Sequence, residues 1–106
     1  MIIATAISRN GVSIRLTSER WDHITLSHKE VDPGNPKSVT AVVESPDSIL
    51  KGDTGEFLAV KKQSGRDFWI VVAYKETDKS DGFIITAYIT TDESWLFQRQ
   101  ILWNKG

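Results

Sequence analysis

The sequence predicts an α+β fold, with helices packed on an antiparallel sheet, in a single α+β domain covering residues 1–106. The first observation is the run at residues 68–74, seven consecutive apolar or aromatic residues rich in β-branched and aromatic types. Such a run indicates a strand buried on both faces, and therefore a central one. The second observation is that β-prone segments flank this run at connections short enough for a meander. The third is that two helical patterns precede these strands.

Composition indicates an ordinary folded domain. Hydrophobic residues make up 40% of the 106 residues and charged residues 25%. The absence of cysteine excludes disulfides and thiolate metal sites and favours a reducing compartment. The apolar start of the chain is short and lacks a basic region, and no run approaches membrane-spanning length. We therefore expect a cytoplasmic protein with no membrane partner.

The chain carries a net charge of −1, which provides no global attraction to nucleic acid. Any binding to phosphate groups must then come from a local basic patch.

The chain opens with a predicted N-terminal strand or hairpin. Residues 2–7 and 12–16 are separated by Asn10-Gly11, a strong hairpin-turn signal.

Thr17 or Ser18 then caps a helix of about a dozen residues. The spacing predicts one apolar stripe on this helix, made of Trp21, Ile24, His28 and Val31.

A second helix follows the break at residues 32–36. Asn35 is the predicted cap and Pro36 belongs to the first turn of a helix that runs through residues 38–44. Its buried side consists of Val39, Val42 and Val43.

The C-terminal half predicts a three-stranded antiparallel meander and a C-terminal helix. The strands cover about 56–62, 67–75 and 82–90. Alternation in the third strand predicts two faces, with Ile85, Ala87 and Ile89 on one and Ile84, Thr86, Tyr88 and Thr90 on the other.

Thr91 or Asp92 then caps a helix in which Trp95, Leu96, Leu102 and Trp103 recur at seven-residue spacing.

The predicted C-terminal helix carries more apolar surface than one stripe can bury. Six of the ten residues at 94–103 are large and apolar, and they are spread around more than one face. Such a surface is covered either by the domain's own sheet or by another chain. In the second case the simplest partner is a second copy, in a two-fold homodimer formed through this helix.

Searches for strong catalytic motifs fail. The chain has no Gly-rich phosphate loop, no HExxH, no Cys/His cluster and no GxSxG. His23 and His28 are five residues apart and lie on different helix faces, which does not suit a shared metal ion. We expect no cofactor and no metal.

Two histidines are the first candidates for chemistry, because imidazole is the one side-chain type that titrates near neutrality without help. His23 lies near the polar face and is either a solvated helix residue or a proton-transfer group. His28 lies on the apolar stripe and is either a packing residue or the second candidate.

Basic and hydroxyl side chains are the other candidates. Lys61, Lys62 and Arg66 cluster around the first turn of the meander, which is either a solvated hairpin end or a cationic site. Thr86 and Tyr88 share one strand face, which is either an ordinary polar face or a row of hydroxyl donors.

Three short motifs, RWDHITLSHKE at residues 20–30, ESPDSI at 44–49 and IITAYITT at 84–91, together resemble a known family. The chain resembles the phage-associated nucleases of the barnase–EndoU–colicin–RelE fold group over roughly residues 14–91. The resemblance implies a RelE/barnase-like fold and metal-independent RNA cleavage, often in toxin systems. It therefore implies RNA as substrate and an antitoxin or other protein as partner. The catalytic set that it implies is His23 with His28 as second candidate, Lys62 or Arg66, Thr86 and Tyr88.

These residue types fit the chemistry. Metal-free RNA cleavage needs a base for the 2′-hydroxyl proton, charge stabilisation at the phosphate and an acid for the leaving oxygen. Trp69 or Tyr74 either stacks a base or belongs to the core.

The alternative function is a non-catalytic protein-interaction module that retains the same fold, which near-neutral charge and the lack of a strong catalytic signature favour. A small-molecule pocket between helices and sheet is a third possibility, based only on generic concavity.

Overall fold

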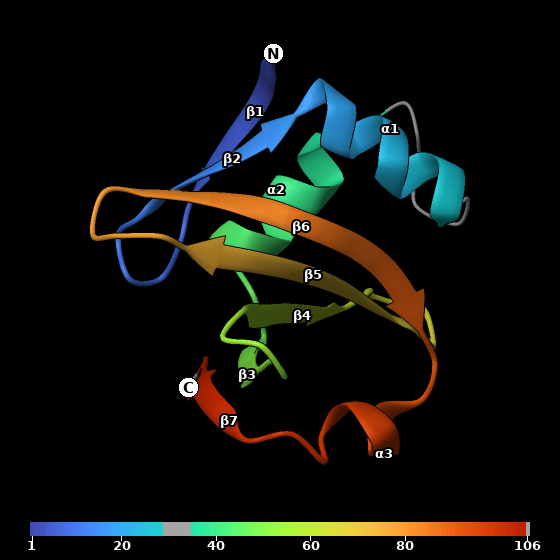
Figure 1. Cartoon of the computed structure of the whole chain (residues 1–106). Helices are drawn as coiled ribbons and strands as arrows, with labels where there is room; N and C mark the ends of the chain where they lie inside the picture. The colour runs from blue at the N-terminus through green and yellow to red at the C-terminus, as the bar shows by residue number, and fades with distance from the viewer. Residues whose placement is uncertain (29–34, 106) are drawn as a thin grey trace.

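A computed structural model describes residues 1–28 and 35–105, which form one mixed sheet with helices on its faces (Figure 1). The elements are β1 Ile2–Ile7, β2 Ser13–Thr17, α1 Ser18–Ser27, α2 Lys37–Glu44, β3 Ser48–Lys51, β4 Phe57–Lys62, β5 Trp69–Glu76, β6 Asp81–Thr90, α3 Glu93–Leu96 and β7 Ile101–Asn104. The sheet order is β1-β2-β6-β5-β4-β3-β7, and every neighbouring pair is antiparallel except β2 with β6. The α+β class is confirmed, with a larger sheet than the sequence predicts. None of the helices in the described part of the chain is long and apolar enough to cross a membrane.

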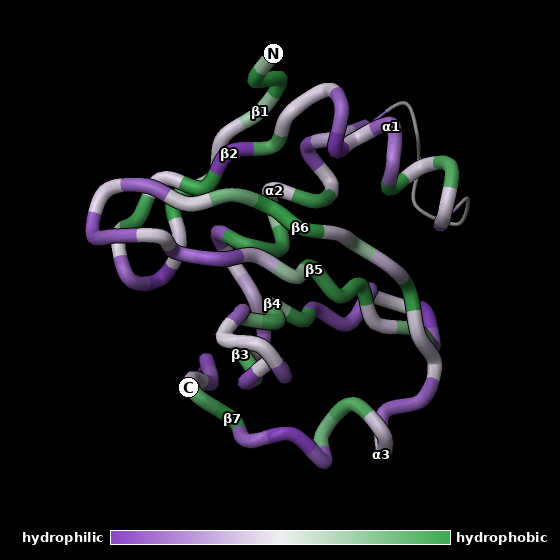
Figure 2. Tube along the Cα trace, viewed as in Figure 1, coloured by the Kyte–Doolittle hydropathy of each residue, from purple (hydrophilic) through white to green (hydrophobic). Residues whose placement is uncertain are grey.

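The predicted central strand is confirmed. β5 stands fourth of the seven strands in the sheet, between β4 and β6. Its buried residues reach both faces: Val72 and Tyr74 belong to one apolar cluster, Val71 and Ala73 to the other. Figure 2 shows the hydrophobic centre of β5 between more hydrophilic turns.

The predicted N-terminal hairpin and helix cap are also confirmed. β1 pairs antiparallel with β2. Gly11 in the connecting turn has φ +81, a conformation that glycine adopts without the strain of a Cβ atom.

The Thr17 hydroxyl accepts a hydrogen bond from the backbone N–H of Arg20 at 3.2 Å and so caps α1. Trp21 and Ile24 of the predicted stripe are buried, whereas Val31 lies outside the described residues.

α2 buries Val39, Val42 and Val43 as predicted. The prediction that the Asn35 side chain caps this helix is wrong, because Pro36 occupies the cap position and makes no side-chain cap hydrogen bond. The proline ring holds Pro36 at φ −59, a helical value, so helical geometry already starts there. Asn35 contributes its carbonyl oxygen, which accepts the Ser38 hydroxyl at 2.8 Å.

The predicted C-terminal helix is wrong beyond its first turn. Asp92 caps α3 as predicted, accepting the Trp95 N–H at 2.9 Å, but α3 has only four residues. The chain then forms β7, in which Trp103 lies opposite Ile49 of β3. Pairing with β7 covers the edge that β3 would otherwise expose, and this long-range gain outweighs the helical spacing of the apolar residues.

One irregularity in β6 changes which side chains share a face. Ala73 of β5 pairs with Thr86, whereas its neighbour Tyr74 pairs with Ile84, so the register shifts between them. This bulge turns Ile84 to the face of Ala87 and Ile85 to the face of Tyr88, so the predicted alternation is wrong at these two residues. Beyond the bulge, Thr86, Tyr88 and Thr90 share one face as predicted.

Two apolar clusters lie on opposite faces of the sheet. α1 and α2 cover one face and contribute Trp21, Ile24 and the three valines of α2. α3 covers the other face, where its Leu96 is fully buried (Figure 1). The candidate site lies where α1 meets the border of the second face.

Candidate functional site

The position of α1 follows from the short contact between β2 and β6. β2 pairs with β6 only at Asp81, Gly82 and Phe83, although β6 continues to Thr90. α1 lies beside the remainder of β6, beyond the end of β2 (Figure 1). The C-terminal end of α1 therefore comes close to the side chains near the end of β6.

His28, the residue that follows α1, contacts Tyr88. The two ring centroids are 5.8 Å apart, with an angle of 40° between the ring planes. The His28 backbone N–H bonds the Ile24 carbonyl at 2.7 Å, which fixes the residue at the helix end. Both side chains are partly buried, so the contact forms a border between solvent and the second apolar cluster.

Burial and the charges around Tyr88 together raise its pKa. Burial raises the pKa of Tyr88, and the Arg99 guanidinium partly opposes this. The carboxylates of Asp53 and Glu56 raise that pKa further. The net pKa lies above the ordinary tyrosine value, so the phenol is a hydrogen-bond donor at neutral pH.

Sequence reasoning missed Arg99. Its guanidinium binds both carboxylate oxygens of Asp53, at 2.9 and 3.3 Å, and lies 5.5 Å from the centre of the Trp95 ring. This ion pair forms because the segment between α3 and β7 crosses the turn between β3 and β4. No signal in the sequence placed Arg99 there, since the helix expected over this segment would direct it elsewhere.

His23 lies on a different side of α1. Its side chain is exposed, and a separation of five residues corresponds to about 140° of rotation around a helix. Of the two predicted histidines, His28 is therefore the one that α1 directs to Tyr88.

The basic candidates lie at the same end of the strands as Tyr88, with β4 two strands away from β6 in the sheet. Lys62, at the end of β4, is opposite Trp69, which in turn is opposite Thr90, so Lys62 and Tyr88 share a face. The side chain of Lys62 is exposed. Arg66 is exposed in the turn between β4 and β5.

The two candidates for base stacking are core residues. Trp69 is 9% exposed and packs edge-on against Phe97, with ring centroids 5.1 Å apart. Tyr74 is fully buried and stacks on Phe57 at 5.4 Å. Neither ring offers a face to RNA.

No grouping of three His, Cys, Asp or Glu side chains suited to a metal ion occurs in residues 1–28 and 35–105. Comparisons of the chain with protein-family models, with curated proteins and with solved structures find no match. Function must therefore be inferred from the side chains themselves.

Proposed function

We propose that this chain is a metal-independent RNA endonuclease, possessing a RelE/barnase-like activity centred on His28 and Tyr88. The observation that carries the proposal is the 5.8 Å ring contact, which places an imidazole beside a phenol that remains protonated. The resemblance of residues 14–91 to toxin-type nucleases supports the choice of RNA.

In the proposed reaction His28 accepts the proton of a ribose 2′-hydroxyl. The 2′-oxygen forms a bond to the adjacent phosphorus, the bond from phosphorus to the 5′-oxygen breaks, and the leaving oxygen takes up a proton from water. The Tyr88 hydroxyl donates a hydrogen bond to a non-bridging oxygen as negative charge develops there. Thr86 adds a hydroxyl on the same face, and Lys62 adds a positive charge.

The experiment is incubation of the purified protein with RNA in EDTA, as free RNA and as ribosome-bound message. The proposal expects fragments ending in 2′,3′-cyclic phosphate and starting with 5′-hydroxyl. Intact RNA at high protein concentration on both substrates would rule the activity out.

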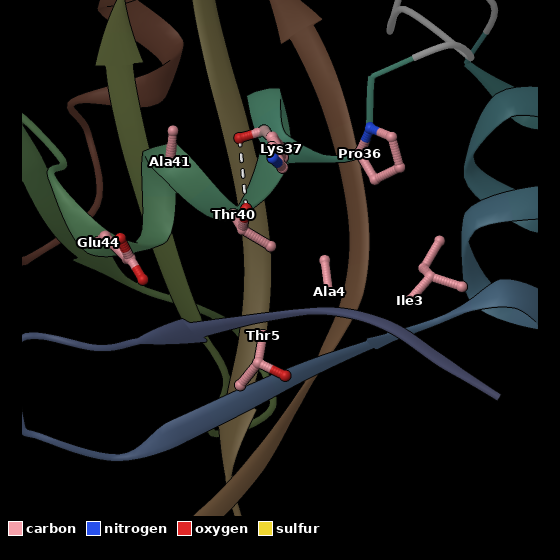
Figure 3. A pocket seen from close by; sticks show the side chains of 8 residues that line it. All are labelled: Ile3, Ala4, Thr5, Pro36, Lys37, Thr40, Ala41 and Glu44. Atoms are coloured by element: carbon pink, nitrogen blue, oxygen red, sulfur yellow. Dashed lines mark hydrogen bonds between the residues drawn. The ribbon is translucent and has the colours of Figure 1, made fainter.

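A second candidate, a non-catalytic protein-interaction module, is favoured by the exposed edge of β1. β1 pairs with β2 on one side only in the described sheet, and its Ile2, Ile3 and Ile7 are 54%, 38% and 52% exposed. A groove of about 520 Å³ separates β1 from α2, lined by Ile3, Ala4, Thr5, Pro36, Lys37, Thr40, Ala41 and Glu44 (Figure 3). An extended segment of an antitoxin or other partner would add a strand here and place alternate side chains in the groove.

Growth on expression separates the two candidates. A nuclease of toxin type slows growth unless an antitoxin is co-expressed, and Tyr88→Phe relieves the effect. A binding module leaves growth unchanged, both as the native protein and as Tyr88→Phe.

The homodimer remains a proposal, but α3 and β7 stand in place of the long C-terminal helix through which it was expected to form. The apolar residues left exposed there are Trp95, Ile101 and Leu102, at 43%, 44% and 43%. A dimer would form through this surface. Sedimentation of the full chain at high micromolar concentration tests it, and a monomer would exclude it.

A further inference from the structure

A groove on the face of the sheet that carries α2 gathers three basic side chains around one tryptophan. It encloses about 410 Å³ and is lined by Arg9, Ser45, Pro46, Lys61, Trp103 and Lys105. These residues come from the turn between β1 and β2, the C-terminal end of α2, β4 and the C-terminal segment.

The curvature of the sheet creates this groove. β1 and β7 are the two outermost strands in the sheet order. Arg9, next to β1, nevertheless lies over the ring of Trp103 in β7, with its guanidinium carbon 4.7 Å from the ring centre. The turn between β1 and β2 therefore reaches β7 near the C-terminal end of α2.

The groove is positively charged. Lys61 donates to the Ser45 carbonyl at 2.8 Å, and Lys105 pairs with Asp47 at 2.8 Å. Asp47 is the one carboxylate that these contacts include, so it offsets one of the three positive charges. Arg9 forms no hydrogen bond or ion pair with the rest of the described chain apart from its contact with the indole.

Asp47 stays ionised beside these cations. Burial raises the pKa of Asp47, but the hydrogen bonds from Lys105 and from the Lys62 N–H lower it. The charges of Lys105 and Lys61 lower it further, and the net pKa lies below the ordinary value. The carboxylate thus orients Lys105, whose side chain is still 66% exposed.

The cations retain donors for a ligand. An ammonium group has three N–H donors, and the contacts of Lys61 with Ser45 and of Lys105 with Asp47 each use one. The guanidinium plane of Arg9 can stack a base, as the half-buried Trp103 already stacks on it. A stacking platform flanked by cations is the combination that single-stranded nucleic acids bind.

We propose that this groove binds single-stranded RNA, with a base stacked on Arg9 and Trp103 and phosphates on Lys61 and Lys105. The choice of RNA rests on the proposed function. The groove provides the local basic patch that a chain of net charge −1 requires for binding phosphates. Lys61 and Lys62 are consecutive in β4 and point to opposite faces, so the groove and Tyr88 lie on opposite faces of the sheet.

The test is fluorescence anisotropy with a labelled 2′-O-methyl RNA of about 12 nucleotides, which binds but cannot be cleaved because it lacks the attacking hydroxyl. The groove variant is R9Q/K105Q. The control is K75Q/K79Q, which removes the same charge from two exposed lysines outside the groove. A third variant, W103L, removes the indole and leaves the charge unchanged.

The proposal expects R9Q/K105Q to bind at least about tenfold more weakly than the control, with a slope of log K against log salt smaller by about 2. W103L should bind several-fold more weakly at unchanged salt slope. Circular dichroism confirms that each variant is folded, and the salt slope of the native protein provides a measurement that needs no variant.

Equal binding by R9Q/K105Q and its control would overturn the proposal. Displacement of the RNA by poly-glutamate as readily as by unlabelled RNA would also overturn it, because the groove would then recognise any polyanion, including an acidic protein. Groove-dependent binding without cleavage of ordinary RNA would refute the endonuclease and uphold the groove. Cleavage of ordinary RNA by the native protein, with RNA binding unchanged in the groove variants, would uphold the endonuclease and refute the groove.

Discussion

The ring of His28, directly after α1, lies 5.8 Å from the ring of Tyr88 on β6. Tyr88→Phe retains this ring contact and removes only the hydroxyl. If that hydroxyl stabilises the phosphate in the transition state, the cleavage rate should fall by about 100-fold. Initial rates on a defined RNA measure the effect. Tyr74→Phe, a core substitution of the same kind, is the matched control, and equal rates for the two variants would contradict the role of Tyr88.

Tyr74→Phe should raise the free energy of unfolding by about 1 kcal/mol, because the buried Tyr74 hydroxyl has no hydrogen-bond partner among the described residues. Burial raises the pKa of Tyr74, and the charge of Glu76 raises it further. Above about pH 10 the unfolded chain loses the phenolic proton of Tyr74, whereas the native protein keeps it. The free energy of unfolding of the native protein therefore falls as pH rises above that value. In urea unfolding, the difference in free energy of unfolding between Tyr74→Phe and the native protein should be larger at alkaline than at neutral pH. A variant less stable than the native protein at both pH values would refute this.

Gly82→Ala should destabilise the domain by about 3 kcal/mol, the upper end of the range for overpacking, because the closest clash is with a backbone atom. Gly82 lies opposite Ile14 where β2 joins β6. A Cβ atom there would lie 2.3 Å from the Lys75 carbonyl oxygen and 2.7 Å from the Ile14 Cδ1 atom. Ser80→Ala, at an exposed position in the preceding turn, provides a nearby control for thermal or urea unfolding. Similar midpoints for the two variants would show that β5 and the Ile14 side chain can both move away from residue 82.

Asp47→Asn should lower the free energy of unfolding by about 1–2 kcal/mol at neutral pH, because it weakens hydrogen bonds from a charged lysine and from a backbone amide. The native pKa of Asp47 is lowered, so its contribution is present above the ordinary carboxyl pKa and is lost as pH falls through the native value. The stability difference should therefore shrink below about pH 4. A difference that is constant down to pH 2, about two units below the ordinary value, would contradict the assignment.

Local signals in the sequence were sufficient for much of the fold. The apolar run in β5, the Asn10-Gly11 turn and the Thr17 cap each specify their structure over a few residues, and the structure confirms them. The three valines of α2 likewise follow from helical spacing alone.

The remaining elements depend on long-range pairing. β3 has only Ile49 and Leu50 as an apolar core, and it exists because β4 and β7 pair with it on either side. Taken alone, residues 101–104 are compatible with a helix as well as a strand. Pairing with the edge of β3 selects the strand. The bulge at Ile84 and the parallel contact between β2 and β6 leave no local pattern either.

The candidate site was predictable only as a list of residue types. Helical spacing separates His23 from His28, but it does not show which of them meets β6. That depends on where β2 stops pairing with β6, so that α1 can lie beside the open part of the strand. Arg99 and Asp53 could not be linked while residues 94–103 were expected to be helical.

The most direct measurement compares RNA cleavage by His28→Ala and His23→Ala, both in EDTA. We expect His23→Ala to cleave at nearly the native rate and His28→Ala to lose about 100-fold or more, in the range for removal of a general base. Added imidazole should restore part of the activity of His28→Ala, which a folding defect would not permit. Native-like cleavage by His28→Ala, or a loss confined to His23→Ala, would contradict the assignment of the site to the contact between His28 and Tyr88.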